Sequence, residues 1–447
     1  MENKIEKELK RIIEILLVKR GEEITEDIVK EKLEKTLLTY KDEKYDFSKL
    51  EKLILKQGKK KRKIMRYSEF SCEEILCIYI KNLLEKKFKI KYPNRNEWVH
   101  TLFNILEATI QMNNFYIIKF DFKDYFNTIS SEYVYNKYIA NSNIEREDKK
   151  LIEKFVKETQ YTYAGLNTSN ILVEIISKEF DKLIHKNFLK KGLIYYKRYI
   201  DDGIIILNNY NSVDEIEELL EECLEAIFES KQSKNKVKFN KEKFKIVSKD
   251  LLPADFDFLG YLFTLTENKN NIKIKYGITK EKITKYTKKI EEIFKDYLKD
   301  NNKEIKLELL RQRLKLFSSR VVYLGQKYNN DIWKVKGFIS NYCELEYKLN
   351  NLDSKTELFL KNKIIEISKK YKLKETEYFL DNSETNIYNL YNNLKNKKTA
   401  IFIEGIGYDK KTLHKLLCKI KPECKTLDKY SYFELVKEYL IITKVGY

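Results

Sequence analysis

Proline, glycine and histidine are scarce in this chain, whose 447 residues include 3 Pro, 12 Gly and 3 His. So few turn-forming residues exclude a collagen-like protein, a linker-rich protein and an all-β protein with many tight turns. The three histidines and six cysteines lack the paired spacing that is typical of zinc sites, so we expect inert, reduced thiols. Helices should therefore form much of the structure.

Long apolar runs are also missing, since no stretch of 18 residues is both apolar and uncharged. The first residues, MENKIEKELKRII, carry charges where a signal peptide would be apolar. We therefore expect a protein of the cytoplasm that has no membrane partner.

Positive charge is in excess, with 88 Lys and Arg against 69 Asp and Glu and a net charge of +19. An apolar content of 43% argues against a disordered chain, and the length suggests two or three domains. A surplus of cations on a folded protein favours an acidic partner, and nucleic acid is the first candidate.

Apolar patterns predict a mixed core between about residues 60 and 265. Residues 115–120 and 195–207 are typical of strands, and the second run divides in two at Ile200-Asp201-Asp202. Between these strands we expect a helix with Ser169 as its N-cap and Gly192 near its end. A further helix should span 213–230. Strands and helices in this order indicate an α+β or α/β core.

The flanking regions should be helical. Apolar residues at helical spacing mark residues 1 to about 56, including 50–55 (LEKLIL). After Gly277 we expect a helical array without an exact repeat period, and strand-like runs only near 272–275 and 400–403. The helical pattern in this part covers 305–323, 355–371, 387–396 and 409–420.

Three carboxylates stand at the ends of the predicted strands. Asp121 closes the first strand, and Asp201 and Asp202 lie at the tip of the predicted hairpin. Carboxylates held close together repel one another unless a cation lies between them. Two Mg²⁺ ions bound there would stabilise the attacking and leaving oxygens of a phosphoryl transfer. The alternative for the Asp pair alone is an ordinary β-turn.

These carboxylates lie in segments that resemble reverse transcriptases. Residues 121–129 (DFKDYFNTI) resemble motif A, and residues 198–202 (RYIDD) resemble motif C, the YxDD box. The resemblance covers about residues 60–265 and implies a right-hand polymerase with palm and fingers. Four further segments occur in the family's order: the fingers motif at 92–96, the end of motif B at 165–170, motif D at 240–243 and motif E at 258–261.

The resemblance assigns metal-binding roles to the residues that match. Asp121 and Asp201 would bind two Mg²⁺ ions, for which Mn²⁺ could substitute, with Asp202 beside them. The backbone oxygen of Phe122 would complete a metal shell. Lys243 would donate a proton to the leaving pyrophosphate.

Other matching residues would contact the nucleotide. Phe126 would be the steric gate against the sugar 2′ position, so dNTPs are the expected substrates and DNA the product; the alternative is a plain core residue. Arg95 and one residue of the basic run 59–66 would hold the triphosphate. Ser169, in the motif B segment, would also belong to the nucleotide site.

One departure affects templating. Most reverse transcriptases that copy a template carry Pro-Gln before the motif B glycine, and this chain has Tyr163-Ala164. That Gln normally packs near the template base and the new pair, so its replacement favours synthesis without a template.

A finer resemblance concerns bacterial defence. Residues 168–174 (TSNILVE) and the helical C-terminal part, including 313–320, resemble the abortive-infection (Abi) reverse transcriptases and related antiphage polymerases. This implies a homo-oligomer in the bacterial cytoplasm that makes DNA during infection. Several members use a protein tyrosine as primer, whereas others in the wider group copy a non-coding RNA. The 33 tyrosines of this chain give no basis for choosing a primer.

The sequence thus predicts a Mg²⁺-dependent DNA polymerase of the reverse transcriptase type in abortive infection. Template-independent synthesis, for which a protein primer is one option, is preferred over the copying of a non-coding RNA. A silent nucleic-acid-binding scaffold is the third alternative, and the clustered carboxylates argue against it because they repel one another without metal. We expect an N-terminal helical segment (1–60), fingers and palm (61–277) and an α-helical C-terminal domain (278–447).

Overall fold

The structure is a computed structural model that describes most of the chain. The described residues form two compact units, one from Met1–Asn94 and Met112–Asp250 and the other from Arg95–Gln111 and Leu251–Tyr447. This division differs from the predicted boundaries at 60 and 277, which stay a prediction. The described residues are 4–20, 25–57, 60–209, 212–228, 236–268, 271–299, 303–327, 330–377, 380, 388–421 and 429–444.

Three helices and a hairpin open the first unit. Side chains such as Leu9, Ile13 and Ile80 are fully buried among the helices α1 (Lys4–Arg20), α2 (Glu26–Lys41) and α3 (Cys72–Lys87). Strands β1 (Glu51–Gln57) and β2 (Lys60–Arg66) form an antiparallel pair. The helix predicted over 50–55 is therefore wrong. A short apolar run does not distinguish helical from strand periodicity, and in the structure pairing with β2 supplies the hydrogen bonds of its backbone N–H and C=O groups.

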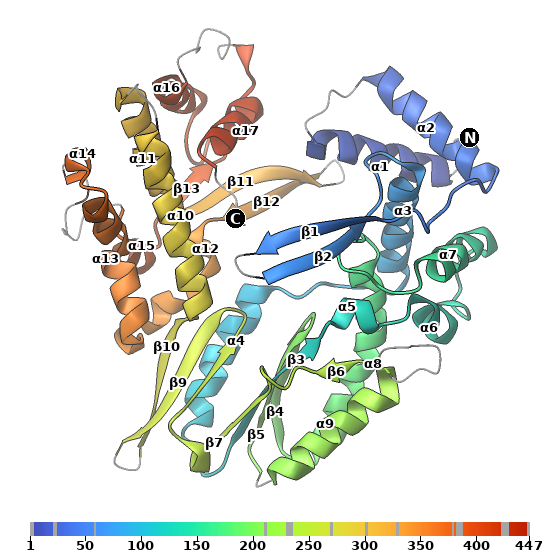
Figure 1. The fold of residues 1–447 in the computed structure, drawn as a ribbon, viewed down its shortest axis with the longest axis horizontal. Helices are drawn as coiled ribbons and strands as arrows, with labels where there is room; N and C mark the ends of the chain where they lie inside the picture. Colours follow the sequence, from blue (N-terminus) through green and yellow to red (C-terminus); the bar gives the residue numbers. More distant parts are fainter. Residues whose placement is uncertain are drawn as a thin grey trace. The chain divides into compact units, whose positions relative to one another are not determined.

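An antiparallel sheet forms the centre of the first unit. Its strand order is β4-β5-β3-β6, and β7 also pairs with β3 (Figure 1). The strands predicted over 115–120 and 195–207 are confirmed as β3, β4 and β5. The bounds are β3 (Tyr116–Lys123), β4 (Leu193–Tyr199), β5 (Asp202–Leu207), β6 (Lys238–Phe239) and β7 (Lys245–Ser248).

Two predicted helices pack against this sheet. They are confirmed as α8 (Ser169–Leu189) and α9 (Val213–Phe228), whose rings Phe180 and Phe228 contact Phe122 of β3. The N-cap of α8 is Thr168 and not Ser169, because the Ser169 hydroxyl donates to the carbonyl of Tyr163 instead. The unit also contains α5 (Tyr125–Thr128), α6 (Ser131–Val134), a π-helical turn (Tyr135–Ile139) and α7 (Arg146–Thr159).

The second unit contains two three-stranded sheets. One has the antiparallel order β10-β9-β8, and the other has the order β12-β11-β13 with β13 parallel to β11. The strand-like runs near 272–275 and 400–403 are confirmed as β10 and β13. The bounds are β8 (Ala254–Phe258), β9 (Tyr261–Asn268), β10 (Asn271–Ile278), β11 (Arg320–Lys327), β12 (Asn330–Lys336) and β13 (Thr399–Phe402).

Helices make up much of the rest of the second unit, as predicted. The helix predicted over 305–323 is too long, because α11 ends at Phe317 and a strand begins at Arg320. The hydroxyls of Ser318 and Ser319 bond back to helix carbonyls, and a β-branched run follows. The helices are α4 (Arg95–Thr109), α10 (Lys280–Leu298), α11 (Lys303–Phe317), α12 (Phe338–Asn341), a 3₁₀-helix (Cys343–Asn351), α13 (Ser354–Lys370), α14 (Lys374–Glu377), α15 (Leu390–Lys395), α16 (Lys410–Ile420) and α17 (Tyr432–Ile442).

The fold class is α+β, with a palm-like sheet in the first unit and a largely helical C-terminal region. In the part of the chain that is described, no helix has the length and apolarity needed to cross a bilayer.

Candidate active site

Strands β3 and β5 bring two carboxylates face to face. Asp121 of β3 pairs directly with Asp202 of β5, so both side chains leave the sheet on the same face. Lys119 lies two residues before Asp121 and shares that face. Asp121 is 5% exposed, and the Asp202 side chain is 25% exposed.

The turn between β4 and β5 carries the third carboxylate. Tyr199 pairs with Asp202, which leaves Ile200 and Asp201 as a two-residue loop. Ile200 has a φ of +60°, a left-handed conformation that is unusual for a β-branched residue. The carbonyl of Asp201 accepts a hydrogen bond of 3.0 Å from the amide of Phe122, which ties the turn to β3.

Each of the two paired carboxylates contacts a lysine. Lys243 Nζ lies 2.6 Å from Oδ2 of Asp121, and Asn240 Nδ2 lies 3.4 Å from Oδ1. Lys119 Nζ lies 3.2 Å from Oδ1 of Asp202, and the side chain of Lys119 is only 2% exposed. Because buried charges are stable only when they are paired, the lysines compensate part of the negative charge.

These neighbours shift the protonation equilibria. The pKa of Asp202 is raised to about 6, mainly by burial and also by the negative charges of Asp121 and Asp201, while Lys119 opposes the rise. Burial by itself would lower the pKa of Lys243, but the hydrogen bond and charge of Asp121 and the charges of the other two aspartates raise it. Lys243 is therefore a protonated ammonium at neutral pH.

The donor set suits a hard cation. Within the residues described, no three His, Cys, Asp or Glu side chains gather into a group that could hold a metal ion alone. Mg²⁺ commonly uses one or two carboxylates together with phosphate oxygens of a substrate, and Asp121 and Asp202 supply two carboxylates on one face. The residues present therefore fit Mg²⁺, with Asp121 and Asp202 as the side chains that would hold it, and the metal contact of Asp201 stays a prediction.

Lys243 contacts Asp121, while Phe122 and Phe126 lie in β3 and α5, close to Asp121 along the chain. Phe122 is buried and stacks on Tyr125, and its predicted metal contact through the backbone oxygen stays a prediction. Phe126 lies in α5 and is partly buried, with its carbonyl accepting a 2.7 Å hydrogen bond from Thr162. Its role as a steric gate also stays a prediction.

Ser169 is 2% exposed, and its hydroxyl donates to Tyr163. This contact gives Ser169 a structural part in the loop before α8. A part in nucleotide binding, which stays a prediction, would require the hydroxyl to leave this partner.

Arg95 belongs to the second unit, where it is the first residue of α4. Its guanidinium donates to the carbonyls of Leu259 at 2.6 Å and Asn341 at 2.7 Å, and it lies over the ring of Tyr261. A contact with a triphosphate, which stays a prediction, would require these hydrogen bonds to break.

Residues 60–66 of the basic run form β2. Lys59 and the side chains of residues 60–62 lie outside the described residues. Arg66 pairs with Glu51 at 3.1 Å and lines a cleft of about 210 Å³ that also borders Gly165 and Asn167. Arg66 is thus a basic residue of this run that faces the motif B segment, beside Ile64 and Met65, which lie against Gly165.

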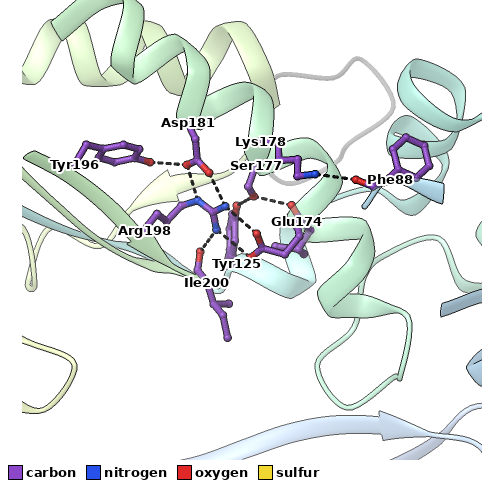
Figure 2. A network of polar contacts seen from close by, with 10 residues as sticks. Phe88, Tyr125, Glu174, Ser177, Lys178, Asp181, Tyr196, Arg198 and Ile200 are labelled. Carbon is purple, nitrogen blue, oxygen red and sulfur yellow. Dashed lines mark hydrogen bonds and ion pairs between the residues drawn. The ribbon is translucent and has the colours of Figure 1, made fainter. Parts of the chain in front are cut away.

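Two charged residues of the site were missed by the sequence analysis. Lys119 left no signal, since a single lysine inside an apolar strand resembles a residue that faces solvent. Arg198 is 4% exposed and contacts Glu174, Asp181 and the carbonyl of Ile200 (Figure 2). The position of Arg198, three residues before Asp201, was the one available signal.

Comparison with protein families identifies the segment that contains the site. Residues 44–263 match the family model described as Reverse transcriptase (RNA-dependent DNA polymerase). This segment includes the three aspartates, Lys119 and Lys243, so the resemblance drawn from the motifs is confirmed at the level of this domain.

Known proteins offer only distant likenesses beyond the family model. No curated protein matches the chain significantly. Among solved structures, apo telomerase from Candida tropicalis truncated from its C-terminal domain is 14% identical, with a TM-score of 0.35 over 51% of this chain and 55% of that one. Telomerase from Candida albicans with a TWJ fragment of telomeric RNA is 12% identical, with a TM-score of 0.36 over 87% and 65%. The chain thus spans less than two thirds of either telomerase, and nothing about substrates or partners follows from likenesses this weak.

Replacing Lys119 by Met should destabilise the first unit, because Asp202 then keeps a largely buried charge without its cation. We expect the free energy of unfolding to fall by about 1–3 kcal/mol, as measured by urea denaturation. Adding Asp202→Asn should recover part of this loss, since the pair is then removed together.

The matched control is Lys245→Met, which removes the exposed lysine directly opposite Lys119 on β7. Its effect should stay within about 0.5 kcal/mol. Equal losses for the two lysines would contradict a specific role of the Lys119–Asp202 pair.

Proposed function

We propose that the protein, whose residues 44–263 match the reverse transcriptase family model, is a Mg²⁺-dependent DNA polymerase that acts in bacterial antiphage defence by abortive infection. The observation that carries the polymerase activity is the register of β3 and β5, which sets Asp121 opposite Asp202 beside the ammonium of Lys243.

The side chains have distinct tasks in this proposal. Asp121, Asp201 and Asp202 would hold Mg²⁺, which when bound would stabilise the attacking and leaving oxygens of nucleotidyl transfer. Lys243 is protonated and half-exposed, so its ammonium can donate a proton to the leaving pyrophosphate. Lys119 is fully buried and keeps the charge of Asp202 compensated.

The loop before α8 supports synthesis without a template. Ala164 stands where template-copying relatives carry Gln, and its carbonyl accepts a 2.8 Å hydrogen bond from the amide of Met65. Gly165 has a φ of +106°, and a Cβ there would lie 2.6 Å from the Met65 carbonyl. The loop is therefore packed closely on β2, and the Ala164 methyl group offers no hydrogen bond to a template base.

The copying of a non-coding RNA is the second candidate. It is favoured by the description of the matching family model, which names an RNA-dependent DNA polymerase. The net charge of +19 suits an RNA template and a DNA product equally well.

The defence role rests on the likeness of residues 168–174 and of the helical C-terminal part to abortive-infection reverse transcriptases. This likeness also implies a homo-oligomer in the bacterial cytoplasm, dNTPs as substrates and a tyrosine of the protein as primer. An infection assay tests it: cells that carry the gene should resist phage, and cells that carry an inactive variant should not.

The templating question has a direct test. Purified protein is incubated with Mg²⁺ and labelled dNTPs without template or primer, and the products are run on a denaturing gel before and after protease. We expect long DNA that enters the gel only after protease and whose sequence is unrelated to any co-purified RNA. DNA that forms only when a particular RNA is added, and that is its complement, would establish the copying mode instead.

Exchange of both turn carboxylates, Asp201→Asn with Asp202→Asn, should reduce dNTP incorporation to background. Asn has the same size as Asp and keeps an oxygen near the Lys119 ammonium, so the fold should survive, but the charge that would hold Mg²⁺ is lost. A chelator should abolish the activity of the parent protein in the same way.

The control for charge loss is Asp255→Ala with Asp257→Ala, which removes two acids from β8 of the second unit. This variant should keep full incorporation. Activity that persisted in the Asp201, Asp202 variant would show that the metal-site assignment is wrong.

Replacing Phe126 by Ala should admit ribonucleotides, because the ring that would exclude the 2′-hydroxyl is removed. We expect the preference for dNTPs over NTPs, measured as the ratio of kcat/KM values, to fall on the order of 10- to 100-fold. Phe88→Ala, which shortens another partly buried ring of the same core, should leave the ratio unchanged. An unchanged ratio in the Phe126 variant would exclude Phe126 as the gate.

A further inference from the structure

The turn that carries Asp201 is held in a strained conformation. Ile200 has a φ of +60°, whereas β-branched residues strongly prefer negative φ values. Such conformations persist only when the surrounding structure over-determines them. Some contact near the turn must therefore keep Ile200 from relaxing.

Arg198 contacts the turn directly. Its Nη1 donates to the carbonyl of Ile200 at 2.7 Å, and its other donors reach Glu174 and Asp181 on α8 (Figure 2). The five N–H groups of the guanidinium make five hydrogen bonds: Nε to Asp181 at 2.8 Å, Nη2 to Asp181 at 3.0 Å and to Glu174 at 3.1 Å, and Nη1 to Glu174 at 3.3 Å and to Ile200. Lysine has only three donors and no fork, so it cannot reproduce this set.

Helix α8 anchors the strand that carries Asp121 as well. Tyr125, four residues after Asp121, makes a 2.5 Å hydrogen bond between its hydroxyl and that of Ser177 on α8 (Figure 2). Ser177 lies between Glu174 and Asp181 in the helix. The segments that follow Asp121 and precede Asp201 are thus fastened to the same two turns of one helix.

We propose that Arg198 is a positioning residue for polymerisation: it holds Ile200 in the left-handed conformation and so fixes Asp201 and Asp202 opposite Asp121. Arg198 touches no reacting group and acts through the turn. The inference deepens the proposed function, because its kinetic test depends on DNA synthesis.

The kinetic test uses Arg198→Lys, alone and with Ile200→Gly. The single variant keeps the charge but loses the fork, and we expect kcat to fall on the order of 100-fold at nearly unchanged KM for dNTP, as for a misplaced catalytic group. Glycine at position 200 adopts positive φ without strain. The kcat of the double variant should therefore rise again on the order of tenfold, which corresponds to the strain of roughly one residue in the left-handed conformation.

The matched control is Arg198→Lys with Lys89→Gly, because Lys89 also has a positive φ (+48°) but is exposed at the end of α3. It should regain no activity. A parent-like kcat in Arg198→Lys, or no difference between the glycines at 200 and 89, would overturn the proposal.

A further variant covers the event that Arg198→Lys does not fold. Arg198→Met with Glu174→Gln and Asp181→Asn removes all three charges together, which a buried site tolerates better than one unpaired charge. It still lacks a donor for Ile200, so it should show the same loss and the same gain from Ile200→Gly. Full activity in this variant would contradict positioning by Arg198.

Hydrogen exchange supplies a readout that does not require activity. The Phe122 amide donates to the carbonyl of Asp201, so a loosened turn should speed its exchange in Arg198→Lys and in the charge-free variant. Unchanged exchange there would overturn the proposal. If the parent protein makes no DNA, the proposed function fails, while faster exchange at Phe122 would still establish the hold of Arg198 on the turn.

Discussion

The site depends on one electrostatic constraint: the register of β3 and β5 forces Asp121 and Asp202 onto the same face of a sheet. The negative charges of two facing carboxylates repel one another, and Asp201 in the adjacent turn adds a third negative charge. Lys243 and Lys119 bring two positive charges. Three carboxylates against two ammonium groups leave the site one negative charge in excess when all are ionised. Burial, together with the negative charges of Asp121 and Asp201, raises the pKa of Asp202.

The opposite face of the same strands supplies the packing that holds this arrangement. Phe120 and Phe122 alternate with Asp121 and therefore point away from the carboxylates, into a cluster with Phe180 and Phe239. Gly203, next to Asp202, is required there, because a Cβ would lie 2.1 Å from the Phe120 ring. Because Gly203 has no side chain, the Phe120 ring can pack across β5, and this apolar packing keeps β3 and β5 in register.

Local signals explain what the sequence could predict. The strands that carry Asp121, Asp201 and Asp202 are apolar runs that end in acids, and they form as predicted. Lys119 and Arg198 could not be found in this way, because their partners Asp202, Glu174 and Asp181 are distant in sequence or on another element. The helix predicted over 50–55 failed for a related reason, since only pairing with β2 decides the conformation of that short run.

The two lysines differ in a way that assigns them different parts. The side chain of Lys119 is 2% exposed and lies within the sheet, so its ammonium cannot move to contact a substrate. Lys243 is 47% exposed and lies in the short connection between β6 and β7. Its ammonium can therefore leave Asp121 and bind an anion that arrives from solvent. A cation bound at Asp121 would weaken the 2.6 Å contact with Lys243 by like-charge repulsion. Under the proposed function, metal binding at Asp121 and release of Lys243 would therefore be linked through this one carboxylate.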